Sequence, residues 1–165
     1  MNRALFLMLG AAAALAAQTA TSIGGLGPAG QMRVNGTTVK FTNVYAYLTE
    51  GFFDKKKDDT VVLLSDRALT DAQMRDEFGL RRMAGEGKLN CVKATIGASG
   101  QMVNYLVGSQ AFKAIPSGGS TEQVFEGTND GRTIAGKVHT KGEQTFFGTK
   151  YEYEATFRAA VQPRK

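Results

Sequence analysis

The chain has 165 residues, a formal net charge of +5, one cysteine and one histidine. This length suits one domain with a hydrophobic core and leaves little room for a second. A single cysteine excludes an internal disulfide, two soft ligands are too few for a zinc site, and scattered positive residues argue against nucleic-acid binding, so we expect no metal, cofactor or nucleic acid.

Residues 1–17 have the pattern of a secretory signal peptide. Arg3 gives a positive start, the apolar run ALFLMLGAAAALAA follows, and small residues end it just before Gln18. This run is shorter than the roughly 20 residues that a membrane-spanning helix needs. We therefore expect export to the periplasm or the medium, cleavage near Ala16 or Ala17, and no transmembrane segment in the processed protein.

Residues 18–30 are predicted to form a flexible N-terminal segment of the processed protein. This segment contains GLGPAG, Gly25 to Gly30, which fits the Gly-x-Gly-x-x-Gly spacing of dinucleotide-binding loops. Such a loop works only between a strand and a helix, because the helix N-terminus binds the pyrophosphate. Here a signal peptide precedes it and the strand-like QMRVNG follows, so we do not expect a nucleotide site.

Residues 31–162 read as a single all-β domain. The Asn35-Gly36 pair predicts a hairpin turn, and the apolar run TVVLLS predicts a strand that is buried on both faces. The final segment TKYEYEATFRAAV alternates strictly, as a strand with one wet face does. The pattern indicates an antiparallel β-sandwich of about eight strands, with an eight-stranded barrel as the alternative. The expected strands are 31–34, 37–50, 60–65, 88–96, 101–107, 121–128, 132–138 and 149–161.

One short helical insertion interrupts the strands. Thr70 and Gln73 have the spacing of a capping box, which marks a helix start. Met74 and Phe78 are four residues apart, so we expect them to share one buried face of this helix. Gly79 is predicted to break it, before a second short turn through LRRMAG. The insertion should cover one end or face of the sheet.

Cys91 lies in the strand-like segment KLNCVKATI. We expect it to be a small buried hydrophobe, with an intermolecular bridge or a redox-active thiol as the alternatives.

Two connections contain a Phe-Phe pair beside lysine, FFDKKK at 52–57 and FFGTK at 146–150, and each adjoins a Tyr-x-Tyr strand. The two Tyr-x-Tyr strands are expected to pair. Adjacent aromatic residues in polar loops form an interaction patch if they are exposed, whereas the alternative places them in the core. The candidate binding residues are Phe52, Phe53, Lys55, Lys56, Lys57, Phe146 and Phe147.

The segments NVYAYLTEGFFDKKKDDTVVLLSD and NDGRTIAGKVHTKGEQTFFGTKYEYEATFRAAV resemble small exported bacterial proteins described only as hypothetical secreted proteins. In these proteins an aromatic strand, a VVLLSD run and a final alternating strand recur. The resemblance implies an exported β-rich domain and no particular activity.

Three function classes follow from these patterns. The first is a secreted or periplasmic binding domain without a catalytic site, which contacts a protein or polymer of the cell envelope. The second is a β-barrel that holds a small apolar ligand. The third is an enzyme with a site near His139, which we do not expect because a lone histidine on an outward strand face lacks a nucleophile and an orienting group.

Overall fold

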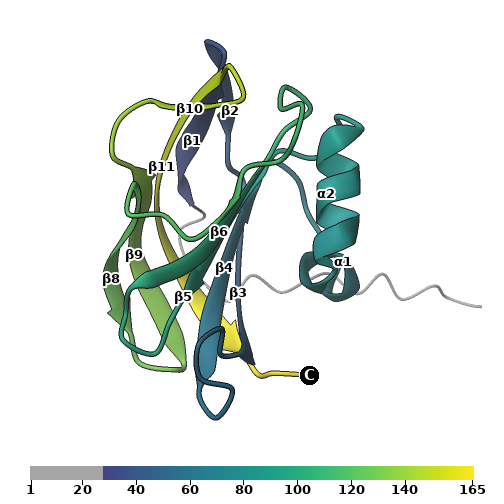
Figure 1. Cartoon of the computed structure of the whole chain (residues 1–165). Helices are drawn as coiled ribbons and strands as arrows, with labels where there is room; N and C mark the ends of the chain where they lie inside the picture. The colour runs from purple at the N-terminus through teal and green to yellow at the C-terminus, as the bar shows by residue number, and fades with distance from the viewer. Residues whose placement is uncertain (1–27) are drawn as a thin grey trace, which may run out of the picture.

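The computed structural model describes residues 28–165, and within this range the chain forms eleven strands and two helices (Figure 1). An all-β fold with a short helical insertion is therefore confirmed. The predicted signal peptide and most of the predicted flexible segment lie outside the described residues. The elements are β1 (Ala29–Val34), β2 (Thr37–Lys40), β3 (Asn43–Glu50), β4 (Asp58–Ser65), α1 (Asp71–Arg75), α2 (Glu77–Gly85), β5 (Cys91–Ile96), β6 (Met102–Gly108), β7 (Ser117–Gly118), β8 (Gln123–Asn129), β9 (Thr133–Thr140), β10 (Gln144–Phe146) and β11 (Thr149–Gln162).

The strands form one curled sheet, a half-barrel, along the path β2-β1-β11-β3-β4-β5-β6-β7. The long strand β11 holds it together because both of its edges pair along its length. One edge pairs with β1 and then β3, and the other pairs with β10 and then β9, which carries β8. The half-barrel has a feature of each architecture expected from the sequence. Its two halves face each other, as the sheets of a sandwich do, and they are connected through β11 and β3, as the strands of a barrel are.

The contact between β11 and β3 is parallel, with Val161 opposite Ala46 and Gln162 opposite Tyr47. The other nine of the ten strand pairings within residues 28–165 are antiparallel. The expectation of a purely antiparallel sheet is corrected at this one junction. The parallel contact is short, and it joins the two halves of the sheet.

The strand expected over 37–50 is divided between the two halves. Backbone N–H groups mark the division: Phe41 donates to the Gly30 carbonyl at 3.0 Å, whereas Thr42 donates to the Ser65 carbonyl at 2.9 Å. The chain thus leaves β1 and joins β4 at this point. This division and the short strands β7 and β10 raise the number of strands from the eight expected to eleven.

The Asn35-Gly36 turn between β1 and β2 is confirmed. Both residues have positive φ, 46° and 83°, which is the backbone geometry of a tight two-residue hairpin turn. The domain itself begins earlier than expected, because Ala29 and Gly30 already belong to β1. A Cβ atom on Gly30 would lie 2.3 Å from the Ala155 Cβ, so the close approach of β1 to β11 requires glycine there.

Strand β4 is buried on both faces, as its apolar run predicts. Val62 and Leu64 point between the two halves of the sheet into the inner core, which also contains Met32, Ile134 and Phe157. On the opposite face, β4 contributes to the helix-side core, which lies beneath α1 and α2. The helix-side core comprises Tyr47, Val61, Leu63, Met74, Leu80, Leu89, Cys91 and Leu106.

The helical insertion begins as predicted but does not continue as one helix. Thr70 and Gln73 form the reciprocal capping box at the start of α1. Asp76 then ends α1 and caps α2, where its carboxylate accepts a hydrogen bond from the Gly79 N–H at 2.9 Å. This new start rotates the following residues, so Phe78 is 87% exposed although Met74 is buried. The shared face of Met74 and Phe78 and the break at Gly79 were therefore wrong.

Cys91 is fully buried in β5, as expected, and burial raises the pKa of its thiol to about 12. The thiolate is the reactive form, so we expect the folded protein to resist alkylation by iodoacetamide near neutral pH. The same reagent should modify Cys91 fully in guanidinium chloride. Rapid modification of the folded protein, followed by mass spectrometry, would show instead that this strand opens readily.

Candidate functional site: a basic cleft beside an aromatic loop

The two Phe-Phe connections differ in exposure. Phe52 and Phe53, between β3 and β4, are 59% and 81% exposed, and their rings lie edge to face with centroids 5.0 Å apart. In the β10–β11 turn, Phe147 is 72% exposed, but Phe146 packs against the inner core. The core alternative is therefore wrong for three of these side chains, and the prediction of an exposed patch is corrected at Phe146.

These two connections lie at opposite ends of the half-barrel (Figure 1). The expected pairing of the two Tyr-x-Tyr strands does not occur, since β3 meets β11 only at Val161 and Gln162. Tyr45 and Tyr47 instead contact the helix-side core, and Tyr151 and Tyr153 point into the inner core. Phe146 and Phe147 therefore cannot act in one contact surface with Phe52 and Phe53.

We call residues 51–57 the aromatic loop, which contains Phe52 and Phe53 and the predicted Lys55, Lys56 and Lys57. Its lysines are exposed. Lys55 and Lys57 make ion pairs with Glu50 at 3.4 Å and with Asp54 at 3.8 Å. The structure thus brings together five of the seven candidate binding residues.

His139 lies on the outer face of β9, on the same side as Lys137, as predicted. Its side chain is more buried than expected, at 17% exposed. Nδ1 lies 3.0 Å from the Thr140 carbonyl oxygen, and Nε2 lies 3.5 Å from Glu126. A carboxylate can orient an imidazole, but these contacts include no hydroxyl or thiol that the histidine could activate. The geometry of His139 thus adds no support to an enzymatic site.

A cleft of about 320 Å³ lies next to the aromatic loop, on the face of β3–β6 that carries α1. Phe52 is part of its wall. Its charged lining residues are four cations and one carboxylate: Arg75, Lys93, Arg164, Lys165 and Glu50. We call it the basic cleft. None of these cations was among the candidate residues of the sequence analysis.

Arg75, at the end of α1, links the helix to the C-terminal segment. Its guanidinium lies 4.5 Å from the centroid of the Tyr47 ring, and it donates to the Gln162 side chain and to the Pro163 carbonyl at 3.3 and 3.2 Å. Tyr47 donates its hydroxyl to the Met74 carbonyl at 2.9 Å. Burial raises the pKa of Tyr47 to about 12 despite the opposing charge of Arg75. Tyr47 is therefore a neutral, fixed part of the cleft floor.

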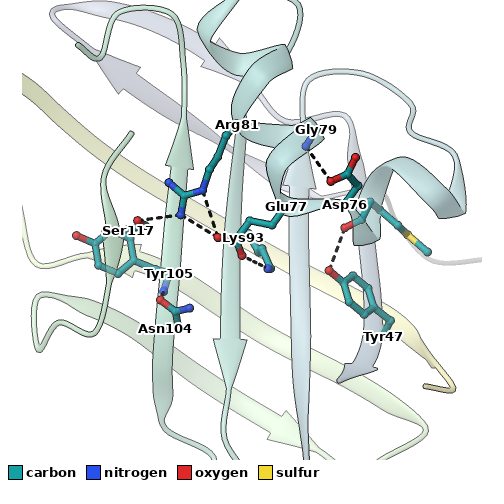
Figure 2. Close-up of polar contacts among 10 residues, drawn as sticks. Tyr47, Asp76, Glu77, Gly79, Arg81, Lys93, Asn104, Tyr105 and Ser117 are labelled. Carbon is teal, nitrogen blue, oxygen red and sulfur yellow. Dashed lines mark hydrogen bonds and ion pairs between the residues drawn. The ribbon is translucent and has the colours of Figure 1, made fainter. Parts of the chain in front are cut away.

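Lys93 is held in place by a carboxylate from α2 (Figure 2). Its ammonium group is 2.6 Å from Glu77 Oε2, and its side chain is only 14% exposed. The other oxygen of Glu77 accepts from Arg81 at 2.8 Å, and Arg81 also donates to the Ser117 hydroxyl at 3.0 Å. Burial raises the pKa of Glu77, but the hydrogen bonds from Lys93 and Arg81 outweigh this and hold it below its usual value. Glu77 therefore stays ionised and anchors the insertion to the sheet.

The counter-ions of the cleft cations lie outside its lining. Arg75 and Lys165 both pair with Asp71, and Arg164 lies 3.1 Å from Asp58. With the contact of Lys93 to Glu77, each of the four cations has a carboxylate partner. The lining thus carries more cations than carboxylates, but the acids just outside it offset this excess, so the cleft offers hydrogen-bond donors rather than a strong positive field. The arrangement suits an anionic group, such as a phosphate or a carboxylate, which could accept hydrogen bonds from these side chains.

One sequence signal pointed toward this site. Lys93 alternates with Val92 and Ala94, so it must share a strand face with Cys91, which was expected to be buried. A lysine on a buried face needs a carboxylate partner. The sequence did not say which acid supplies it, because Glu77 reaches Lys93 only through the packing of α2 on the sheet.

Among residues 28–165, no group of three or more His, Cys, Asp or Glu side chains is placed to hold a metal ion, and neither helix is long and apolar enough to cross a membrane. Comparison of the sequence with known protein families, with curated proteins and with solved structures found no match. The resemblance to hypothetical secreted proteins therefore stays an expectation, and any functional conclusion rests on the geometry of this chain.

Proposed function

We propose that this protein is an exported binding domain that holds an anionic group of a cell-envelope partner in the basic cleft. The observation that carries the proposal is the composition of the lining, which gathers four cationic side chains and one carboxylate beside an exposed aromatic pair. Arginine and lysine side chains bind phosphates and carboxylates through charge-assisted hydrogen bonds, so an anionic ligand can replace an acid that pairs with them. Residues 1–17 are expected to direct export, and we therefore expect the partner to belong to the cell envelope.

Binding, rather than catalysis, fits the chemistry of the lining. Its lining residues include two threonines and a tyrosine but no histidine or cysteine. None of the hydrogen bonds found within residues 28–165 joins a hydroxyl of this lining to Glu50, Lys93 or Lys165 as a base. The hydroxyl of Tyr47 donates to the Met74 carbonyl and is not free to act as an acid. The side chains of the inner core fill the space between the two halves of the sheet, which gives the apolar-ligand alternative no specific support.

Titration with inorganic phosphate, followed by amide NMR shifts, tests the cleft directly. We expect saturable shifts at residues that line it, such as Thr49, Lys93 and Asn104, and few shifts elsewhere. Replacing both Arg164→Gln and Lys165→Gln should weaken phosphate binding about tenfold, which corresponds to about 1.4 kcal/mol.

The matched control for this titration is Arg158→Gln, which removes an exposed cation from β11 that does not line the cleft. It should leave phosphate binding unchanged. A parallel titration with sodium chloride at equal ionic strength separates binding from screening. Shifts spread evenly over the surface, or the same loss in the control variant, would overturn the proposal.

A further inference from the structure

The aromatic loop presents apolar surface that neither core uses. Single exposed apolar side chains are common on protein surfaces, and Phe78 and Phe147 are examples. Phe147 has an adjacent ring too, but that ring, Phe146, packs against the inner core. Phe52 and Phe53 differ because both adjacent rings are exposed in the connection between β3 and β4. Clustered exposed apolar surface of this kind marks an interaction site.

Hydrogen bonds hold the aromatic loop in one shape. The Phe52 N–H donates to the carboxylate of Asp59 at 2.8 Å, and Asp59 is itself buried. The Gly51 N–H donates to the Lys57 carbonyl at 2.9 Å, and the Lys57 N–H donates to the Asp54 carbonyl at 3.0 Å. A Cβ on Gly51 would lie only 2.4 Å from the Asp54 carbonyl oxygen, so this closed turn requires glycine. The loop thus holds both rings in place before a partner binds, so binding requires little further ordering of the loop.

The lysines of the loop are available to anionic groups of a partner. Lys55 and Lys57 make their ion pairs, at 3.4 and 3.8 Å, on the protein surface. Exposed ion pairs contribute little to stability, so these ammonium groups can exchange a carboxylate for a phosphate at small cost. Lys56 is exposed between them. Arg164, in the wall of the basic cleft, pairs with Asp58, which directly follows the aromatic loop.

Size and the combination of side chains favour a lipid surface over a protein partner. A stable protein interface buries roughly 800 Å² on each side, whereas two rings on a protruding turn offer much less than that. Aromatic rings lie favourably at the headgroup level of a bilayer, and nearby lysines and arginines attract anionic lipids. The aromatic loop combines an aromatic pair and three lysines within seven residues, with Asp54 as its one acid and Glu50 and Asp58 at its ends.

We infer that the protein docks on an anionic membrane surface through the aromatic loop and the basic cleft. The rings of Phe52 and Phe53 enter the interfacial layer, and the loop lysines and the cleft cations contact headgroup phosphates. This inference rests on the proposed function, because it names lipid phosphate as the anionic group that the cleft binds. It also explains why the aromatic pair lies beside the cleft.

Flotation with vesicles tests this inference. The purified protein, with removal of its first residues checked by mass, is mixed with vesicles of phosphatidylcholine that contain phosphatidylglycerol, or with phosphatidylcholine alone. We expect binding to the mixed vesicles and much weaker binding to phosphatidylcholine. The double variant Phe52→Ser, Phe53→Ser should reduce vesicle binding at least about tenfold, because it removes the apolar surface that enters the lipid. Replacing Lys55, Lys56 and Lys57 by glutamine should reduce binding to the mixed vesicles only.

The matched control is Phe78→Ser, which removes an equally exposed ring from α2 and should leave vesicle binding unchanged. Thermal melting checks that the variants fold, and Phe53→Ser alone serves if the double variant melts early. Equal loss in the Phe78 variant, or unchanged binding in the Phe52 and Phe53 variant, would overturn the inference.

Phosphate binding in the cleft without vesicle binding would reject lipid as the partner, favour a protein or polymer, and leave the proposed function standing. Failure of the phosphate titration would count against the proposed function itself.

Discussion

Replacing Leu64 by alanine is expected to lower the free energy of unfolding by about 2–5 kcal/mol, and replacing its neighbour Leu63 should cost about as much. Both side chains are fully buried, Leu64 in the inner core and Leu63 in the helix-side core. In a strand with one wet face, adjacent residues would instead differ sharply. The two similar values, measured by denaturant unfolding, would confirm that α1 and α2 cover the outer face of β4.

Strand β11 supplies the comparison, because its residues alternate between buried and exposed. Phe157→Ala should cost about 3–5 kcal/mol, whereas the adjacent Thr156→Ala should change stability by less than about 0.5 kcal/mol. If Leu63→Ala behaved like Thr156→Ala, the helix-side core would contribute nothing, and the insertion would be only loosely attached. The comparison requires that every variant unfolds in one cooperative transition.

Glu77→Gln should lower the free energy of unfolding by about 1–3 kcal/mol, because it removes the carboxylate that Lys93 and Arg81 share. Lys93 is largely buried, and without a counter-ion its charge would be poorly solvated. By contrast, Lys93→Met should be much less harmful, since methionine fills similar space and needs no partner. In the double variant the loss should be smaller than the sum of the two single losses, which a double-mutant cycle measures.

The contribution of Glu77 should also depend on pH. Its pKa is lowered in the folded protein, so its stabilising effect is fully present above the unfolded value of roughly 4.3. The effect is lost as the pH falls through the lower folded value. The stability difference between the wild type and Glu77→Gln should therefore shrink on acidification. Equal stability of the two proteins at neutral pH would mean that the contact of Glu77 with Lys93 does not anchor the insertion.

The Glu77 variants distinguish a residue that positions a cleft cation from residues that contact a ligand themselves. Glu77 does not line the cleft but positions Lys93, which does. Phosphate titration of Glu77→Gln should therefore show altered shifts at Lys93 even where the fold is intact. Helix α2 thus acts on the proposed function through the placement of one cation.

The features that could be predicted from the sequence are local ones. The capping box at Thr70 and the turn at Asn35-Gly36 depend on residues within a few positions of each other, and both are present. The burial of both faces of β4 follows from its unbroken apolar run, and that of Cys91 from the tendency of a free cysteine in a strand to be buried. The seven candidate binding residues were chosen on similar grounds, and this choice located the aromatic loop but also included a turn at the opposite end of the molecule.

In the helical insertion, a correct helix start led to a wrong prediction of the buried face. The spacing of Met74 and Phe78 predicts one buried stripe only if the helix continues between them. Asp76 interrupts it, because its carboxylate caps a new helix by accepting from the Gly79 N–H. The two side chains then lie on helices with different axes, and Phe78 faces solvent.

The sequence by itself determined the fold class, the start of the helical insertion and the two-faced burial of β4, because hydrophobic periodicity and capping act over short distances. Only the tertiary structure decided that β11 joins both halves of the sheet, that the two Phe-Phe connections lie apart, and that four cations line one cleft. Lys93 and Arg164 are far apart in the chain, and they line the same cleft because the end of β11 pairs with β3. The energy of such contacts comes from long-range packing, on which local sequence patterns carry little information.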